Sequence, residues 1–152
     1  MQKMTMTDQH YRDLARILRK VEFFAPMTMG ELERILPYIM LCRFKDGEAV
    51  FKQGEEGDAF YILESGKVGV HVKKGFFSFS KKVAELKAGD FFGEMALLSK
   101  DKRNATIRCE GETQLFILLS IDFQTVLATN PSFAEDMRKI AERRRFESSH
   151  DK

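Results

Sequence analysis

The chain has 152 residues, of which 43% are hydrophobic and 32% charged, with 25 basic and 23 acidic side chains. Its length is that of one domain or slightly more, with enough apolar residues to fill a core. The near balance of charge gives no reason to expect nucleic acid as a partner. The absence of any apolar run of about 18 residues argues against a membrane span, and the polar start lacks the apolar centre of a secretory signal.

The two cysteines, Cys42 and Cys109, each lie in a run in which apolar and polar residues alternate. Such positions favour buried, reduced thiols over a disulfide, which agrees with a cytoplasmic location. The three histidines are too dispersed to predict a metal site, and no nucleophile elbow, P-loop lysine or zinc pattern is present. We therefore expect no catalytic residue, no metal and no cofactor, and no direct insertion of this chain into a membrane.

Residues 1–40 predict a helical segment. Thr7 or Asp8 is placed to cap a first helix, and the pattern Thr28-x-x-Glu31 is that of a capping box that opens a second helix. Apolar residues recur at helical spacing in the first of these helices, at Leu14, Ile17, Leu18 and Val21.

The pattern changes over residues 41–119, where glycines fall roughly every ten residues and separate short runs of β character. Short strands at this spacing predict an antiparallel sandwich or barrel. The segment Lys73–Lys82, with the sequence Lys-Lys-Gly-Phe-Phe-Ser-Phe-Ser-Lys-Lys, fits this pattern of short strands less well. It is either a long hairpin with lysines at its tip or a partly mobile loop. Exposed phenylalanines there would mark a contact surface, but we favour their burial against the barrel.

Helical character returns over residues 120–152. A helix is expected to start at Ser120, and Pro131 suits the first position of another helix. The basic run Arg143–Arg145 suits a helix C-terminus, and the tail beyond it is expected to fray. Taken together, the three segments predict a single domain of the α+β class, mainly β with flanking helices.

Residues 92–106 hold the residues with the clearest chemistry. Gly93 allows a sharp turn and the close approach of a ligand. Residues 94–98 are good helix formers, and the first turn of a helix presents free N–H groups to an anion. Arg103 adds a charged fork that can hold two phosphate oxygens. The carboxylate of Glu94 would repel phosphate, but it could accept a hydrogen bond from a sugar hydroxyl. A ligand with a phosphate next to a sugar hydroxyl is a nucleotide. The alternative is a salt bridge between Glu94 and Arg103 on the barrel rim.

The stretch Phe92-Gly93-Glu94-Met95-Ala96-Leu97, followed by Arg103-Asn104-Ala105, resembles the phosphate-binding cassette of the cyclic-nucleotide-binding domain family. A second pattern from Val50 to Gly66 matches that family in its glycine, acidic and apolar positions. The resemblance covers roughly residues 20 to 145. Within the family, the sequence most resembles the domains of prokaryotic cyclic-nucleotide-gated potassium channels. It implies an eight-stranded antiparallel β-roll, or jelly-roll barrel, with N-terminal helices, a short cassette helix and C-terminal lid helices.

The resemblance also implies roles for individual residues. Glu94 would accept the ribose 2′-hydroxyl, and Arg103 would pair with the cyclic phosphate. Val70 would pack on the base. The remaining cradle residues, some through their backbone N–H groups, would be Gly93, Met95, Ala96, Asn104 and Ala105.

In the family, the helix after the barrel closes over the base. Arg145, or Arg144, matches the position of a lid arginine, with Phe146 as a stacking alternative, and an arginine could stack on a purine through a cation–π contact. Threonine directly after the cassette arginine is associated with guanine, whereas this chain has Asn104, which offers both a donor and an acceptor. We favour cAMP, with cGMP as the alternative.

The resulting hypothesis is a regulatory sensor module. Binding of cAMP or cGMP would move the C-terminal and N-terminal helices and act on an attached or partner effector, such as a channel pore. The alternative is a DNA-binding transcription regulator of the catabolite-activator type that lacks its helix-turn-helix domain. An enzyme that hydrolyses the nucleotide would need a metal or a positioned base, and the sequence predicts neither.

Overall fold

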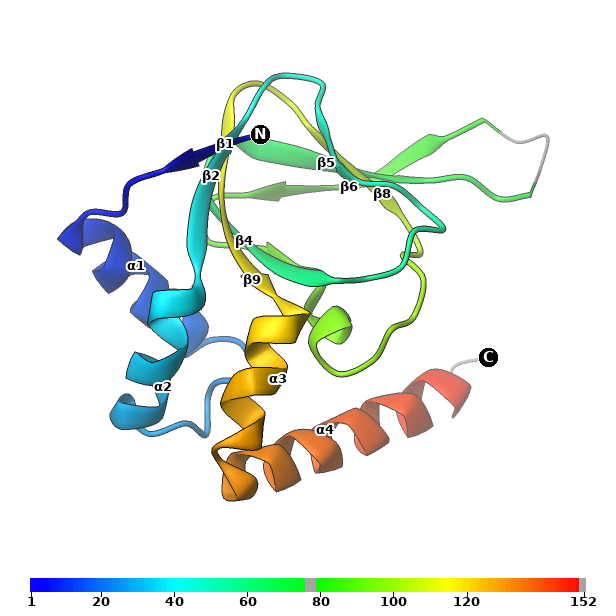
Figure 1. The fold of residues 1–152 in the computed structure, drawn as a ribbon. Coiled ribbons are helices and arrows are strands. Elements are labelled where there is room, and N and C mark those ends of the chain that lie inside the picture. Colours follow the sequence, from blue (N-terminus) through cyan, green and yellow to red (C-terminus); the bar gives the residue numbers. More distant parts are fainter. Residues whose placement is uncertain (76–78, 151–152) are drawn as a thin grey trace.

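A computed structural model describes residues 1–75 and 79–150, apart from the side chains of residues 141 and 144–150. The described strands form two antiparallel sheets, with helices at one end (Figure 1). The first sheet has the order β1-β2-β9-β4-β7, formed by Gln2–Met4, Met40–Phe44, Thr113–Leu119, Ala59–Ser65 and Phe91–Phe92. The second sheet has the order β3-β8-β5-β6, formed by Ala49–Phe51, Thr106–Cys109, Lys67–Val72 and Lys81–Lys87.

The first sheet is buried on both faces. In β9, Leu115 and Ile117 pack into a core shared with the second sheet, whereas Phe116 and Leu118 pack into the core beneath the helices. The strand β4 divides its side chains in the same way. Because successive residues of a strand point to opposite faces, burial of both faces explains why these two strands are apolar at nearly every position.

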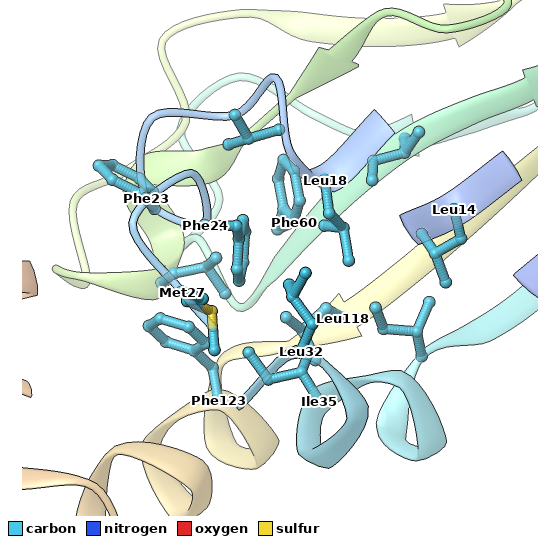
Figure 2. Packing of buried hydrophobic residues seen from close by; sticks show 14 of the residues in the cluster. Leu14, Leu18, Phe23, Phe24, Met27, Leu32, Ile35, Phe60, Leu118 and Phe123 are labelled. Atoms are coloured by element: carbon cyan, nitrogen blue, oxygen red, sulfur yellow. The ribbon is translucent and has the colours of Figure 1, made fainter. Parts of the chain in front are cut away.

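The helices begin where the sequence predicts. Thr7 caps α1 (Asp8–Leu18), and Thr28 and Glu31 form the capping box of α2 (Met29–Ile35). A short 3-10 turn, η1 (Leu36–Tyr38), leads into β2. After β9 come α3 (Ser120–Ala128) and the long helix α4 (Pro131–His150). The helical core joins α1, α2 and α3 to the outer face of the first sheet (Figure 2), and its labelled members include Leu14, Leu18, Phe24, Leu32, Phe60 and Phe123.

The α+β class is confirmed, but two details differ from expectation. The described chain has nine strands, because Gln2–Met4, within the segment expected to be helical, pairs with the open edge of β2. The preference for buried phenylalanines in the hairpin between β5 and β6 was wrong at Phe79, which is 95% exposed. The pairing of β5 with β8 ends at His71, so among the described residues no third strand of the sheet extends to the part of the hairpin that carries Phe79. Phe76 and Phe77 lie outside the described residues.

Both cysteines are free and buried, as predicted. Burial raises the pKa of each thiol, because the thiolate loses its hydration. Among the helices of the described residues, none combines the length and apolar character needed to cross a bilayer.

Candidate functional site

The connection between β7 and β8 carries the cassette predicted from the sequence. Gly93 has a φ of +77° and starts the 3-10 helix η2 (Glu94–Leu97). A Cβ at this position would lie 2.7 Å from Nη1 of Arg103 and 3.2 Å from the carbonyl oxygen of Ala59. Both the left-handed backbone and the lack of space therefore require glycine here.

Arg103, the arginine of the cassette, is buried, with only 9% of its surface exposed. Its Nη2 donates to the carbonyl oxygen of Ala59 at 2.7 Å, and its Nη1 donates to that of Gly93 at 3.4 Å. Its Nε is buried without a hydrogen-bond partner among the described residues. Burial lowers the pKa of the guanidinium, because the cation loses hydration. A buried cation with an unused donor is suited to receive an anion.

An aromatic floor supports this arginine. Its guanidinium carbon lies 4.0 Å from the ring centroid of Phe51, within the range of a cation–π contact. The rings of Tyr61 and Phe92 stack at 5.1 Å, and Phe51 packs against both. Burial raises the pKa of Tyr61 to about 12, so its phenol stays neutral at physiological pH. The arginine is therefore held in place by aromatic rings and by the carbonyl groups of Ala59 and Gly93.

Arg103 opens onto a cavity of about 440 Å³ between the cassette and the second sheet. The volume lies within the range of small-molecule sites. Val70 and Leu86 give it an apolar wall, and residues of the cassette give it a polar one. Every ligand residue predicted from the sequence, except Arg145, lines this cavity: Val70, Gly93, Glu94, Met95, Ala96, Arg103, Asn104 and Ala105.

The backbone on either side of Arg103 differs in its hydrogen bonding. The N–H of Arg103 donates to the carbonyl oxygen of Glu55 at 2.7 Å, and its own carbonyl accepts from Gly54 at 2.8 Å, which ties the cassette to the loop before β4. Within the described part of the chain, the N–H groups of Asn104 and Ala105 have no assigned acceptor. Two amides and a guanidinium donor thus lie at one end of the cavity, a donor set that suits a phosphate.

Several residues at the site were missed by the sequence interpretation. Phe51 and Leu86 line the cavity, but their place there depends on sheet pairing that the sequence pattern did not define. Gly57 does not line the cavity but supports the cassette from behind. It is buried against the cassette, where a Cβ would lie 3.1 Å from that of Ala96 and 3.4 Å from Cζ of Arg103. The only available signal was its place in the second family pattern.

The predicted lid contact cannot be placed. Arg145, together with its alternatives Arg144 and Phe146, belongs to α4, but these side chains lie outside the described residues. Arg143 forms an ion pair with Glu22, in the connection between α1 and α2. It is absent from the residues described as lining the cavity.

Residues 41–130 match the family model of the cyclic nucleotide-binding domain. The chain belongs to this family. The domain is 30% identical over 138 residues to a putative potassium channel protein, RPA4233, of Rhodopseudomonas palustris, covering 89% of this chain and 33% of that protein. It is 35% identical over 108 residues to a cGMP-dependent protein kinase of Eimeria tenella, covering 71% of this chain and 10% of the kinase.

Among solved structures, the domain resembles the N-terminal domain of a transcriptional regulator from Streptomyces coelicolor, with a TM-score of 0.74 at 24% identity. That match covers 89% of this chain and 93% of the other, and it shows that the fold is shared. The chain spans a third or less of the two curated relatives. No group of three or more metal-ligating side chains is found among the described residues.

Proposed function

We propose that this domain is a sensor that binds cAMP, with cGMP as the alternative, and relays binding to an effector. The observation that carries the proposal is Arg103, a buried arginine whose Nε has no partner among the described residues and which lines a cavity of ligand size. The cyclic phosphate would accept from Arg103 and from the N–H groups of Asn104 and Ala105. The activity is binding rather than catalysis.

Other residues of the cavity are suited to bind the ribose and the base of a nucleotide. Glu94 lines the same cavity, and its carboxylate would accept the ribose 2′-hydroxyl in a charge-assisted hydrogen bond. Val70 and Leu86 would pack on the base, where burial of apolar surface stabilises the complex without choosing between purines. The choice of cAMP over cGMP rests on Asn104, because threonine at that position is the feature associated with guanine.

The relay would run through α4. Phe133 and Met137 anchor the start of this helix in the helical core, and Arg143 joins it to Glu22 after α1. A movement of α4 toward the ligand would therefore disturb the N-terminal helices as well. The ligand drives such a change only by its preference for the closed state, and a shift from 1:99 to 99:1 needs a preference of roughly 10⁴-fold.

The effector is proposed from the curated relatives. We favour a channel pore, because a putative potassium channel protein matches over most of this chain. A cytoplasmic location would give the sensor access to cyclic nucleotides and agrees with its free, buried thiols. The catabolite-activator alternative draws on similarity to solved structures of transcription regulators, and no residue of the site favours it.

Calorimetric titration tests the proposal. Unmodified protein should bind cAMP with one site per chain and more tightly than cGMP, and absence of heat for both at tens of micromolar protein would contradict it. Glu94→Gln should weaken cAMP binding by about tenfold to a hundredfold, since a hydrogen bond to a charged group contributes about 1.5–3 kcal/mol. The unmodified protein should bind 2′-deoxy-cAMP, which has no 2′-hydroxyl, more weakly than cAMP. Glu94→Gln should bind 2′-deoxy-cAMP with nearly the same affinity as the unmodified protein does.

A further inference from the structure

The hairpin between β5 and β6 extends beyond the rest of its sheet (Figure 1). The pairing of β5 with β8 ends at His71, opposite Thr106. The pairing of β5 with β6 continues to Val72, opposite Lys81. From Val72 outward, the described part of the hairpin therefore pairs with no strand outside the hairpin.

Apolar side chains on this hairpin are exposed. Phe79 is 95% exposed and Val83 is 57% exposed. With Val72, Lys74 and Lys81 they line a shallow hollow of about 430 Å³. These side chains therefore lie close together instead of being scattered singly. An exposed apolar patch rimmed by polar groups is the kind of surface that binds a partner or a membrane.

The outer part of the hairpin is positively charged. Residues 65–84 contain five lysines and no acidic residue. Lys73, Lys74 and Lys81 are exposed, and the described ion pairs include none of them. Lys82 differs, because it bridges Glu85 at 2.8 Å and Glu110 at 2.7 Å. Two of these lysines, Lys74 and Lys81, line the apolar patch, whereas Lys73 lines a different hollow.

A second hollow, of about 630 Å³, lies at the base of the hairpin. His71, Lys73 and Arg108 contribute basic side chains, and its described lining includes no carboxylate. Gln53 accepts from the N–H of Lys73 at 2.8 Å and donates to its carbonyl at 2.9 Å. This pair of hydrogen bonds fixes the hairpin at Lys73. Because His71 and Lys73 alternate with Val72 and Lys74 along the chain, the basic hollow lies on the opposite face of the hairpin from the apolar patch.

We propose that this hairpin docks the domain onto an anionic phospholipid membrane. Phe79 and Val83 would enter the boundary between headgroups and acyl chains, as the apolar faces of interfacial segments do. Lys74 and Lys81 border those side chains and would remain at the level of the headgroups. This refines the expectation that the chain does not insert into a membrane: no helix of the described residues could span one, but Phe79 and Val83 would form an interfacial anchor flanked by cations.

A single tryptophan tests the proposal, because the natural chain has none. Phe79→Trp should show a blue shift of its fluorescence with phosphatidylcholine vesicles that contain phosphatidylserine, and none with phosphatidylcholine alone. Ile121→Trp is the matched control, since Ile121 is also exposed, at 71%, but lies on α3. No shift at position 79 would overturn the proposal. So would a shift that appears on raising the protein concentration without vesicles, which would assign the hairpin to contact between copies of the chain.

The lysines are tested by vesicle sedimentation. Replacing Lys73, Lys74 and Lys81 by glutamine should weaken binding to the anionic vesicles by about a hundredfold, at about fivefold per lysine near an anionic surface. Lys87→Gln, at the far end of β6, should bind as the unmodified protein does. Unchanged binding of the triple variant, measured alongside unchanged thermal unfolding, would overturn the assignment of these charges.

Discussion

Replacing Arg103 by alanine should weaken cAMP binding by about 30-fold to 5,000-fold, the equivalent of about 2–5 kcal/mol for losing one partner of a buried charged pair. The arginine is 9% exposed and has a buried Nε without a partner among the described residues. No other basic side chain of the cavity lining is buried, because Lys102 is exposed. Titration calorimetry with cAMP measures the loss directly.

The controls for this variant use a neighbouring arginine and a conservative change. Arg108 lies on β8, the strand that follows Arg103, but it is exposed and donates to the carbonyl oxygen of Gly47, so Arg108→Ala should leave cAMP affinity unchanged. Arg103→Lys should remain strongly impaired, because an ammonium group cannot reproduce the planar fork. Thermal unfolding identifies any loss of fold. Normal affinity in a folded Arg103→Ala protein would remove this residue from the site.

Replacing Gly93 by alanine should have a comparable effect on binding by a different route. The new Cβ would lie 2.7 Å from Nη1 of Arg103 and 3.2 Å from the carbonyl oxygen of Ala59. The arginine must then move from the floor of the cavity, and we expect a loss of affinity of at least tenfold. The left-handed backbone adds a loss of stability of about 1–2 kcal/mol, which chemical denaturation measures.

Gly111 separates these two effects. It has a φ of +85°, but nothing lies within 4 Å of an added Cβ. Gly111→Ala should therefore lose a similar amount of stability while retaining its cAMP affinity. Equal cAMP affinities in the Gly93→Ala and Gly111→Ala variants would contradict this account. They would show that glycine at position 93 serves only to avoid backbone strain and does not help to position Arg103.

Local signals explain what was predictable from the sequence. The capping residue Thr7 and the capping box at Thr28 act within one helical turn, and both occur as expected. The cassette was also predictable, because Gly93, Glu94 and Arg103 lie within eleven residues of one another. Their convergence on one cavity needs only a tight turn and a short helix, both of which the local sequence favours.

Features that depend on pairing between distant segments were not predictable in the same way. The strand β1 forms because the edge of β2, about forty residues away, is open to it. Leu86 reaches the cavity through the register of β5 with β6, which contains an irregularity between Val70 and His71. The exposure of Phe79 follows from the length of that hairpin relative to β8, and a local apolar pattern does not encode this relation.

The location of the nucleotide is tested most directly by amide chemical shifts on addition of cAMP. The amides of Asn104 and Ala105 have no acceptor assigned within the described part of the chain, and we predict that they move among the most, together with those of Gly93 to Ala96. The amides of His71 and Arg108, on the basic hollow outside the cavity, should move little. Large shifts confined to that hollow, or none at the cassette with saturating cAMP, would contradict a nucleotide site at Arg103.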